Sequence, residues 1–223
     1  MEIRELLQKP LEGLNKYNVQ DTFAKIARNL FNNCYIECGD IEYYFAEIEF
    51  YYYDKEQCLG SSAEQFKWQL ITYAHCDKKV GDFLYHLSGI DICFDSRIDS
   101  DCARFGGILI RSIKDSNDKV IAAGPYTCRD FILNECCRKT MLMPKLGFCE
   151  KMFDITPIPT YRYISANDLQ IDKDLELKLC FYDGRLNWSK TSEKDVYDKK
   201  KGTIVPNQTR NYFRLTKLQN DNR

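Results

Sequence analysis

The chain has 223 residues, of which 44% are hydrophobic and 29% are charged. This composition is typical of a globular protein and excludes a disordered chain, so we expect a single domain over residues 1–223. The net charge is −1, so the chain as a whole lacks the basic excess typical of nucleic-acid binders. No apolar run is long enough to span a bilayer, and residues 1–5 do not resemble a secretion signal. We therefore expect a protein of the bacterial cytosol that does not bind membranes.

The eleven cysteines do not form a recognisable disulfide or metal pattern. Their number is odd, and Cys136 and Cys137 are adjacent, an awkward arrangement for a single bridge. There is no CxxC motif and no histidine at zinc-ligand spacing. We expect most of the cysteines to be reduced thiols packed in the core, and we expect neither a metal nor a cofactor.

Hydrophobic spacing predicts a helix followed by a hairpin in the N-terminal part of the chain. The helix opens at Asp21, with apolar residues at helical spacing after it. Strands are predicted at 34–38 and 41–52, joined by a turn at Gly39 and Asp40. Residues 57–76 are ambiguous, with a short helical stripe as one interpretation.

The rest of the chain is predicted to add strands and one helix. The predicted segments are strands at 83–94 (broken at Gly89), 107–113 and 120–123, a helix at 126–138, and weaker strands at 176–182 and 211–215. The predicted class is α+β, a single domain with a mostly antiparallel sheet and a few packed helices.

The segment 41–53 carries two carboxylates among aromatic residues. Side chains alternate between the two faces of a strand. Strict alternation predicts one apolar face with Tyr44, Ala46, Ile48, Phe50 and Tyr52, and a second face with Tyr43, Phe45, Glu47, Glu49, Tyr51 and Tyr53. Acids among rings indicate a cavity with a functional carboxylate; the alternative is a sheet edge with exposed acids and tyrosines.

Arg111 lies in an otherwise apolar strand, where alternation predicts that it shares a face with Leu109 and Ile113. A guanidinium in such a place needs an anion, and Glu47 or Glu49 is the expected partner. The pair is either functional or purely structural.

Gly124 and Pro125 precede a predicted helix, whose N-terminus is suited to a phosphate, although proline is also ordinary at a first turn. The two histidines, His75 and His86, lie in no catalytic or metal motif, and we expect both to be structural.

In their order along the chain, these segments resemble the alkyladenine (3-methyladenine) DNA glycosylase family. Residues 24–31 are similar to its opening "ARxLLG" helix and residues 45–51 to its "IVETEAY" strand. Later similarities are residues 83–90 to "YVYxxYGM", 107–113 to "xVLLRAxEP", 123–125 to "SGPxKLCxAL" and 211–214 to "PxRFYV". The resemblance implies a curved sheet with flanking helices and a monomer that flips a modified base out of double-stranded DNA.

The resemblance also implies roles for individual residues. Glu49 takes the place of the general base that activates water, with Arg111 beside it. Tyr51 and Tyr85 take the places of the rings that sandwich the flipped base. The helix start at Gly124, Pro125 and Tyr126 is expected to bind a DNA phosphate. The implied reaction is monofunctional hydrolysis of the N-glycosidic bond, which leaves an abasic site.

Three departures from the family alter the expected substrate. Ser88 replaces the intercalating tyrosine, Asp95 replaces an asparagine that screens purines, and no histidine lies between Tyr51 and His75. Additional acceptors, including Glu47 and Asp95, favour a bulky or glucosylated pyrimidine of phage DNA, and hence antiviral defence.

Three alternatives stay open. One is base excision repair of alkylated purines. The second is a glycoside hydrolase that uses Glu47 and Glu49 as its paired carboxylates. The third is a non-catalytic nucleic-acid binding module.

Overall fold

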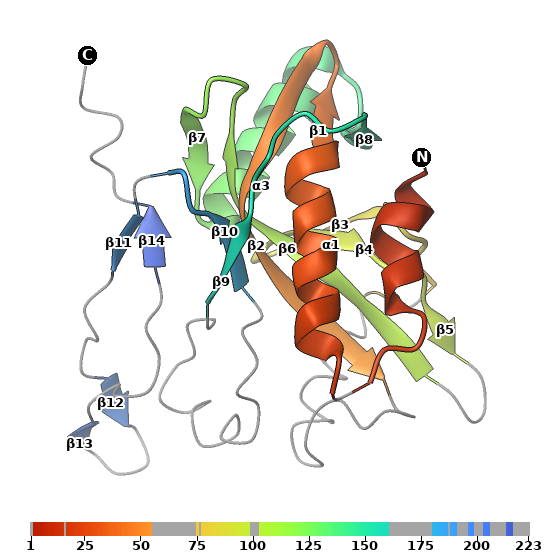
Figure 1. Cartoon of the computed structure of the whole chain (residues 1–223). Helices are drawn as coiled ribbons and strands as arrows, with labels where there is room; N and C mark the ends of the chain where they lie inside the picture. The colour runs from red at the N-terminus through yellow and green to blue at the C-terminus, as the bar shows by residue number, and fades with distance from the viewer. Residues whose placement is uncertain are drawn as a thin grey trace.

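The computed structural model describes residues 2–15, 17–54, 75, 77–98, 103–160, 180–186, 188–190, 196–198, 203–205 and 213–215. These residues form an α+β fold with an antiparallel sheet, as the sequence predicts (Figure 1). Within these ranges, no helix has both the length and the apolar character needed to cross a membrane.

The N-terminal region is helical. A π-helical turn, η1 (Arg4–Gln8), and a 3-10 turn, η2 (Lys9–Leu11), precede the predicted long helix α1 (Val19–Asn33). α1 begins two residues before Asp21, which lies in its first turn. η1 and α1 lie side by side against the sheet (Figure 1). The buried stripe of α1 packs on strand β2, where the Phe23 and Phe50 rings stack with centroids 4.4 Å apart.

The main sheet has the strand order β3-β4-β6-β2-β1-β8, and every pairing in it is antiparallel. Its strands are β1 (Cys34–Cys38), β2 (Ile41–Asp54), β3 (Phe83–His86), β4 (Gly89–Cys93), β6 (Ala103–Lys114) and β8 (Lys145–Phe148). Strands β5 (Arg97–Ile98) and β7 (Val120–Ala123) pair with β6; β10 (Cys180–Asp183) pairs with β2 and with β9 (Pro157–Thr160). Two separate two-stranded ladders join β11 (Trp188–Lys190) to β14 (Phe213–Leu215), and β12 (Val196–Asp198) to β13 (Thr203–Val205).

The sequence-based elements are confirmed with changes in detail. The predicted strand 83–94 is a hairpin, since residues 87 and 88 form a turn between β3 and β4. The helix after Pro125 is α3 (Pro125–Ile132), which continues as the π-helical segment η4 (Leu133–Thr140). Strands β10 and β14 cover the ends of the strands predicted at 176–182 and 211–215. Residues 176–179, and all of 57–76 except residue 75, lie outside the described residues.

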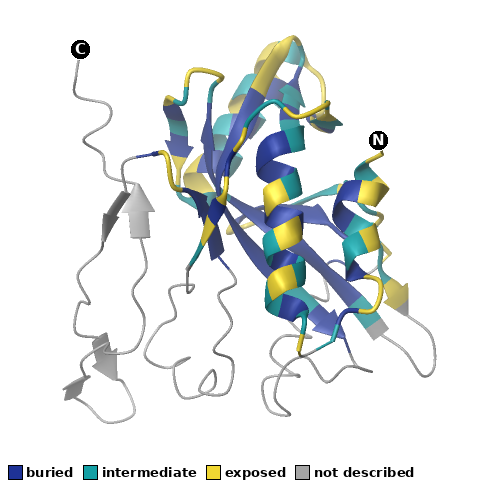
Figure 2. Ribbon diagram, viewed as in Figure 1, coloured by how far each residue is buried: buried dark blue, intermediate teal, exposed yellow. Residues whose placement is uncertain are grey.

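The apolar core lies on one face of the sheet. Phe45, Ile48 and Phe50 of β2 and Ile108 and Ile110 of β6 are completely buried there. Residues of α1, α3 and η4 belong to the same core cluster, and Figure 2 shows the buried side of α1 turned toward the sheet. The opposite face of the same strands carries ionisable side chains, and it contains the candidate site.

Candidate active site

Two offset β-bulges place the key side chains on one face. In the pairing of β2 with β6, Phe45 faces Ile113, Glu47 faces Ser112 and Ile48 faces Ile110. Ala46 is therefore an extra residue on β2, and Arg111 is an extra residue on β6. A bulge of this kind shifts the alternation of side chains by one position.

The bulges correct the strict alternation expected from the sequence. Tyr43 and Phe45 lie in the core with Ile48 and Phe50, whereas Glu47 and Glu49 lie on the opposite face. Ile113 likewise belongs to the core and does not share the face of Arg111. The expectation that Glu47 and Glu49 share a face holds.

Arg111 joins the two carboxylates in a charged bridge. Its Nε donates to Glu47 Oε1 at 2.9 Å, and its Nη1 donates to Glu49 Oε2 at 2.5 Å. The Ser112 hydroxyl donates to the second oxygen of Glu47 at 3.0 Å. The predicted partnership of Arg111 with the acids is therefore present, with both acids rather than one.

The bridge is buried but reaches the surface through Arg111. Glu47 and Glu49 are buried, while 22% of the Arg111 side chain is exposed. Burial disfavours the guanidinium cation, but the charges of Glu49 and Glu47 more than compensate, so the pKa of Arg111 is raised well above its ordinary value. Arg111 stays charged at every accessible pH.

Buried ion pairs are not unusual on this face, so pairing alone does not identify a catalytic site. At the far end of β6, Lys114 Nζ lies 2.5 Å from Asp183 and 2.6 Å from Asp118. The side chains of Lys114 and Asp183 are fully buried, which indicates a structural role. The Arg111 bridge differs because the cation that joins its two buried carboxylates is itself partly exposed, whereas Lys114 is fully buried.

A second polar cluster contains both histidines of the chain. His75 Nε2 is 2.9 Å from Asp91 Oδ2, and His86 Nε2 is 3.2 Å from Asp91 Oδ1. Burial opposes ionisation of Asp91, but the bonds from His75 and His86 outweigh it, so the pKa of this carboxyl is lowered. Asp91 is thus a carboxylate at neutral pH, with an imidazole on each side.

The two clusters share one face of the sheet. Leu109 of β6 is paired with Asp91 on one side and with Glu49 on the other, so these three residues form a row across three strands. Strand spacing places the Asp91 and Glu49 backbones about 10 Å apart. The sequence analysis missed this cluster, although an aspartate between Ile90 and Ile92 in a buried strand is itself a signal.

His75 lies beside Tyr51 because of a glycine. Gly107 is paired with Tyr51 in the sheet, and a Cβ added to it would lie 2.8 Å from His75 Nε2. The imidazole therefore packs against the bare backbone of Gly107. The sequence has no histidine between Tyr51 and His75, but the fold brings His75 itself against the residue that pairs with Tyr51.

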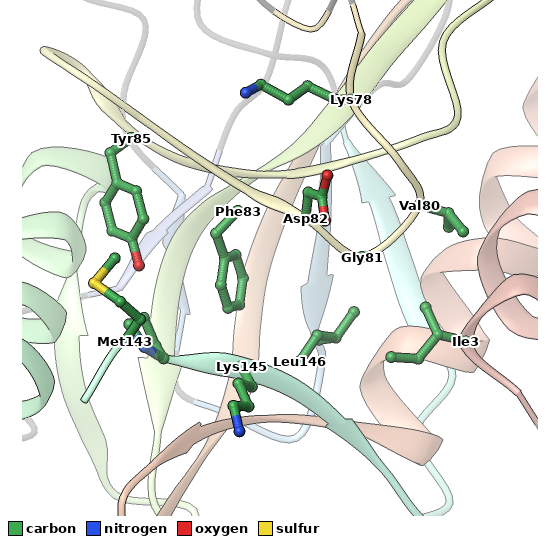
Figure 3. A pocket seen from close by; sticks show the side chains of 11 residues that line it. Ile3, Lys78, Val80, Gly81, Asp82, Phe83, Tyr85, Met143, Lys145 and Leu146 are labelled. Carbon is green, nitrogen blue, oxygen red and sulfur yellow. The ribbon is translucent and has the colours of Figure 1, made fainter.

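Tyr85 does not face Tyr51. It is paired with Ile90 of the core, so its ring lies on the opposite face of the sheet from Glu49 and Tyr51. There it lines a cavity of about 480 Å³ with Phe83, Leu146 and Met143 (Figure 3). The expected sandwich of Tyr51 and Tyr85 is therefore wrong in this structure, because both side chains obey the sheet alternation.

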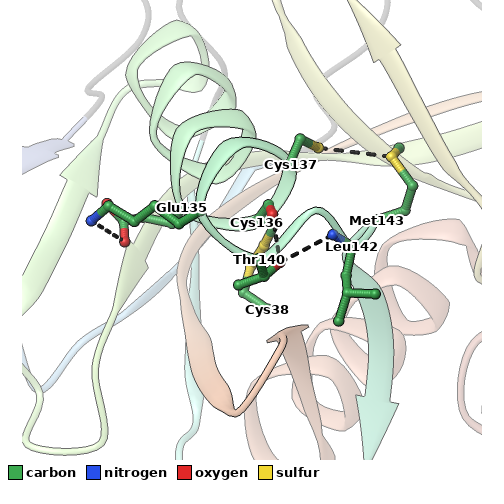
Figure 4. Close-up of a disulfide and its surroundings, with 8 residues drawn as sticks. Cys38, Glu135, Cys136, Cys137, Thr140, Leu142 and Met143 are labelled. Atoms are coloured by element: carbon green, nitrogen blue, oxygen red, sulfur yellow. Dashed lines mark hydrogen bonds and ion pairs between the residues drawn. A yellow bond between two sulfur atoms is a disulfide. The ribbon is translucent and has the colours of Figure 1, made fainter.

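Met143 also lies next to the only disulfide among the described cysteines. Cys38 at the end of β1 is bonded to Cys136 of η4, with Cα atoms 4.9 Å apart, and Cys137 Sγ lies 3.7 Å from Met143 Sδ (Figure 4). The adjacent cysteines leave the helix in different directions, so one is bonded and the other is free. Cys34, Cys93, Cys128 and Cys149 are free thiols as well, as expected for most of the cysteines.

Asp95 is held far from the carboxylate bridge. Its side chain accepts a hydrogen bond from the Val80 backbone N–H at 2.8 Å and forms an ion pair with Arg4 of η1. Its backbone N–H donates to Gln8. These contacts tie β4 to the N-terminal helices, so the expected contact of Asp95 with substrate is not supported.

The β3–β4 turn and the start of α3 form one rim beside Arg111. Ser88 is exposed at the turn, next to Leu87, whose exposed fraction is 88%. Arg129 of α3 donates to the Leu87 and His86 carbonyls and thereby fixes the turn.

The helix start lies close to the bridge. The Gly124 N–H donates to the Arg111 carbonyl at 2.7 Å, and its φ of 94° favours glycine. Pro125 contacts the hairpin near Gly89, and Tyr126 is 59% exposed. Phosphate binding by Gly124, Pro125 and Tyr126 stays a prediction.

No cluster of three or more potential metal-ligating side chains occurs among the residues that the structure describes. No family model, curated protein or solved structure matches the chain. The resemblance to alkyladenine DNA glycosylases therefore rests on the sequence motifs alone.

Proposed function

We propose that the protein is a monofunctional DNA glycosylase, a hydrolase that flips a modified base out of double-stranded DNA and cleaves its N-glycosidic bond. The observation that carries the proposal is the Arg111 bridge, which joins the buried Glu47 and Glu49 to a partly exposed guanidinium. A fixed carboxylate next to a cation is suited to binding and deprotonating a water molecule.

The proposed reaction uses Glu49 as the general base. Glu49 takes a proton from water while the water oxygen bonds to C1′ and the C1′–N bond to the base breaks. Arg111 orients the Glu49 carboxylate, and Glu47 with Ser112 fixes the other side of the guanidinium. No lysine takes part, so the expected product is an intact abasic site.

The rim formed by the β3–β4 turn and the start of α3 is suited to contact duplex DNA. Leu87 projects from a turn that Arg129 holds in place, and apolar side chains of this kind are inserted between base pairs by other DNA-binding proteins. We therefore assign the wedge role to Leu87 instead of Ser88. The start of α3 adds backbone N–H groups for a phosphate.

The contacts of Asp95 and His75 weaken the preference for a glucosylated pyrimidine over an alkylated purine. Asp95 is occupied by structural contacts, and His75 lies beside Tyr51, so two of the three departures that favoured a glucosylated pyrimidine lose their force. Both substrate classes are therefore tested together. Release of glucosylated pyrimidines of phage DNA would mean antiviral defence, and release of alkylated purines would mean repair.

A glycoside hydrolase is the weaker candidate. Such enzymes need one of their two carboxyl groups protonated as a general acid. Glu47 and Glu49 both accept hydrogen bonds from one guanidinium, so the contacts do not single out either carboxyl group as the general acid.

The test is base release by purified protein. DNA containing glucosylated 5-hydroxymethylcytosine, DNA containing 7-methylguanine and unmodified DNA are incubated at equal salt, then treated with alkali to reveal abasic sites. Glu49→Gln should abolish release while keeping DNA affinity, and Glu42→Gln, an exposed acid on the same strand, is the matched control. Equal release by wild type and Glu49→Gln would refute the mechanism, and DNA binding without release by the wild type would favour a binding module.

A further inference from the structure

We infer that the cavity between strands β3 and β8 is a binding site for an uncharged, planar aromatic molecule that carries a hydrogen-bond acceptor. The cavity has a volume of about 480 Å³, which lies within the range of about 300–1,000 Å³ that is common for small-molecule sites. It lies on the opposite face of the sheet from the Arg111 bridge, so the inference does not rest on the proposed function.

The cavity is formed by the two ends of the main sheet. β3 and β8 are the first and last strands in its order, yet residues of both line the same space, because the sheet curls. The apolar side chains of the lining come from these strands, from the residues that precede them and from the N-terminal region. They are Ile3, Val80, Phe83, Tyr85, Met143 and Leu146 (Figure 3). Ile3 closes the end near Gly81, where a Cβ added to the glycine would lie 3.2 Å from Ile3 Cγ2.

Two aromatic rings form the wall of the cavity on the β3 side. Phe83 and Tyr85 are two residues apart on one strand, so their Cα atoms are about 7 Å apart and their side chains share a face. Figure 3 shows both rings extending from β3 toward β8. A planar aromatic ligand can stack on such rings or meet them edge to face, whereas an aliphatic chain gains no comparable contact. The wall therefore favours an aromatic ligand.

The Tyr85 hydroxyl is a buried hydrogen-bond donor at this cavity. Its oxygen is buried, and no residue in the described part of the chain bonds to it. Burial, with a smaller contribution from Cys137, raises the pKa of Tyr85 above its ordinary value of about 10, so the hydroxyl keeps its proton at neutral pH. A buried donor without an acceptor is unfavourable, and a carbonyl oxygen of a ligand would satisfy it.

Met143 is the side of the cavity that a ligand can displace. Figure 3 shows the Tyr85 hydroxyl directed toward the side chain of Met143, a residue that is 60% exposed. Met143 Sδ lies 3.7 Å from Cys137 Sγ, which is a weak contact. The flexible side chain of methionine adapts readily to different neighbours. A ligand can therefore reach the hydroxyl by moving one exposed side chain, without any change in the sheet.

The charged side chains at the cavity do not provide a counter-ion for its interior. Asp82 and Lys145 are exposed, and the Asp82 carboxylate accepts a hydrogen bond from the Lys79 backbone N–H at 3.0 Å. In Figure 3 the ammonium groups of Lys78 and Lys145 lie outside the space between the rings and β8. A charged ligand would lose its hydration in this space without gaining a salt bridge. We therefore expect an uncharged ligand.

The test uses coumarin as the probe, an uncharged bicyclic aromatic lactone with a carbonyl acceptor. Equilibrium dialysis measures its dissociation constant, which should be about 0.1–1 mM for wild type, an ordinary value for so small a molecule. 1-Methylindole, a bicyclic aromatic molecule without such an acceptor, is the first comparison probe. Coumarin-3-carboxylate, which is charged, is the second and should bind at least about tenfold more weakly than coumarin, because its hydration is lost.

Two variants locate the site. Tyr85→Phe keeps the ring and removes the donor, so it should weaken coumarin binding by about 3–10-fold, the effect of one hydrogen bond, and leave 1-methylindole binding unchanged. Leu146→Phe adds volume to the lining and should weaken the binding of both probes. Phe148→Leu changes an exposed residue of the same strand that does not line the described cavity, and this control should bind as wild type does.

Wild type that binds neither coumarin nor 1-methylindole would refute the site. Equal effects of Tyr85→Phe on the two probes would overturn the assigned hydrogen bond, and tighter binding of the charged probe would overturn the assigned class of ligand. Urea midpoints show whether each variant folds. A folded Leu146→Phe that binds coumarin as wild type does would place the binding elsewhere and overturn the inference. If Leu146→Phe does not fold, the comparison of Tyr85→Phe with wild type decides.

Discussion

At the scale of single residues, the site depends on one cation shared by two carboxylates. Arg111 is irreplaceable in this arrangement because its planar guanidinium donates in two directions at once, to Glu47 and to Glu49. A lysine ammonium lacks this fixed geometry. The electrostatic state of the whole site therefore follows from a single side chain.

Replacing Arg111 by methionine should destabilise the protein. Loss of the cation leaves the buried Glu47 and Glu49 without their partner, so the free energy of unfolding at pH 7 should fall by about 3–5 kcal/mol.

Urea unfolding of Arg111→Met and wild type at pH 7 measures this effect. Arg185→Met is the matched control, since Arg185 forms a more exposed ion pair with Asp183 and Asp118. A loss of stability for Arg111→Met no larger than that for Arg185→Met would contradict the account of the bridge.

The residues of the bridge could be predicted from the sequence, but other site residues could not. Glu47, Glu49 and Arg111 stand out because charges in apolar strands need partners. Tyr85 and Asp95 were misplaced because strand alternation and a contact with the distant Arg4 decide their positions. The position of His75 near this site could not be predicted, since only the fold brings His75 to Gly107.

At the scale of elements, the β3–β4 hairpin connects the two polar clusters to the surface. It carries Asp91 in its second strand, His86 at the end of the first and Leu87 in its turn. Arg129 fixes the turn to α3. One hairpin thus carries a contact between a carboxylate and an imidazole and an exposed apolar side chain.

Leu87→Ala should slow base release from duplex DNA by roughly tenfold or more, because a wedge that fills the gap left by the flipped nucleotide is removed. Release from the same sequence as a single strand should be unaffected, since no stacked gap exists there. Single-turnover rates on both substrates provide the measurement. Met141→Ala, at an equally exposed apolar position, is the control. Equal slowing on single and double strands would contradict the wedge role.

Most elements up to Arg138 were predictable, since apolar spacing and turn residues are local signals. Local patterns do not reveal paired bulges, because a bulge is defined by its partner strand. For the same reason the sequence did not predict β8, whose partner β1 is more than a hundred residues away.

At the scale of the whole molecule, the Cys38–Cys136 bond links the first hairpin to the segment after α3. It closes a sequence separation of 98 residues, which restricts the unfolded chain strongly. Structural disulfides are uncommon in a reducing cytosol, the compartment predicted from the sequence. The contribution of the bond to folding stability can be measured directly.

Cys38→Ser should lower the free energy of unfolding by about 2–4 kcal/mol in the absence of reductant. Dithiothreitol should lower the stability of wild type by a similar amount and leave the variant unchanged. Urea midpoints with and without reductant measure both effects, and Cys137→Ser is the control because Cys137 is a free thiol. A wild-type midpoint that ignores reductant would show that the bond does not form.

The paired bulges have a consequence for how the chain tolerates insertions and deletions. Ala46 and Arg111 are the extra residues of their strands; the pairs Ile48–Ile110, Glu47–Ser112 and Phe45–Ile113 run past them. Deleting both residues would leave two regular strands with every core side chain on its present face. Deleting Ala46 or Arg111 alone would remove only the bulge of its own strand and leave the same residue pairs in place. The sheet can therefore exist without the site, because the cation of the bridge is the one residue that the bulge adds to β6.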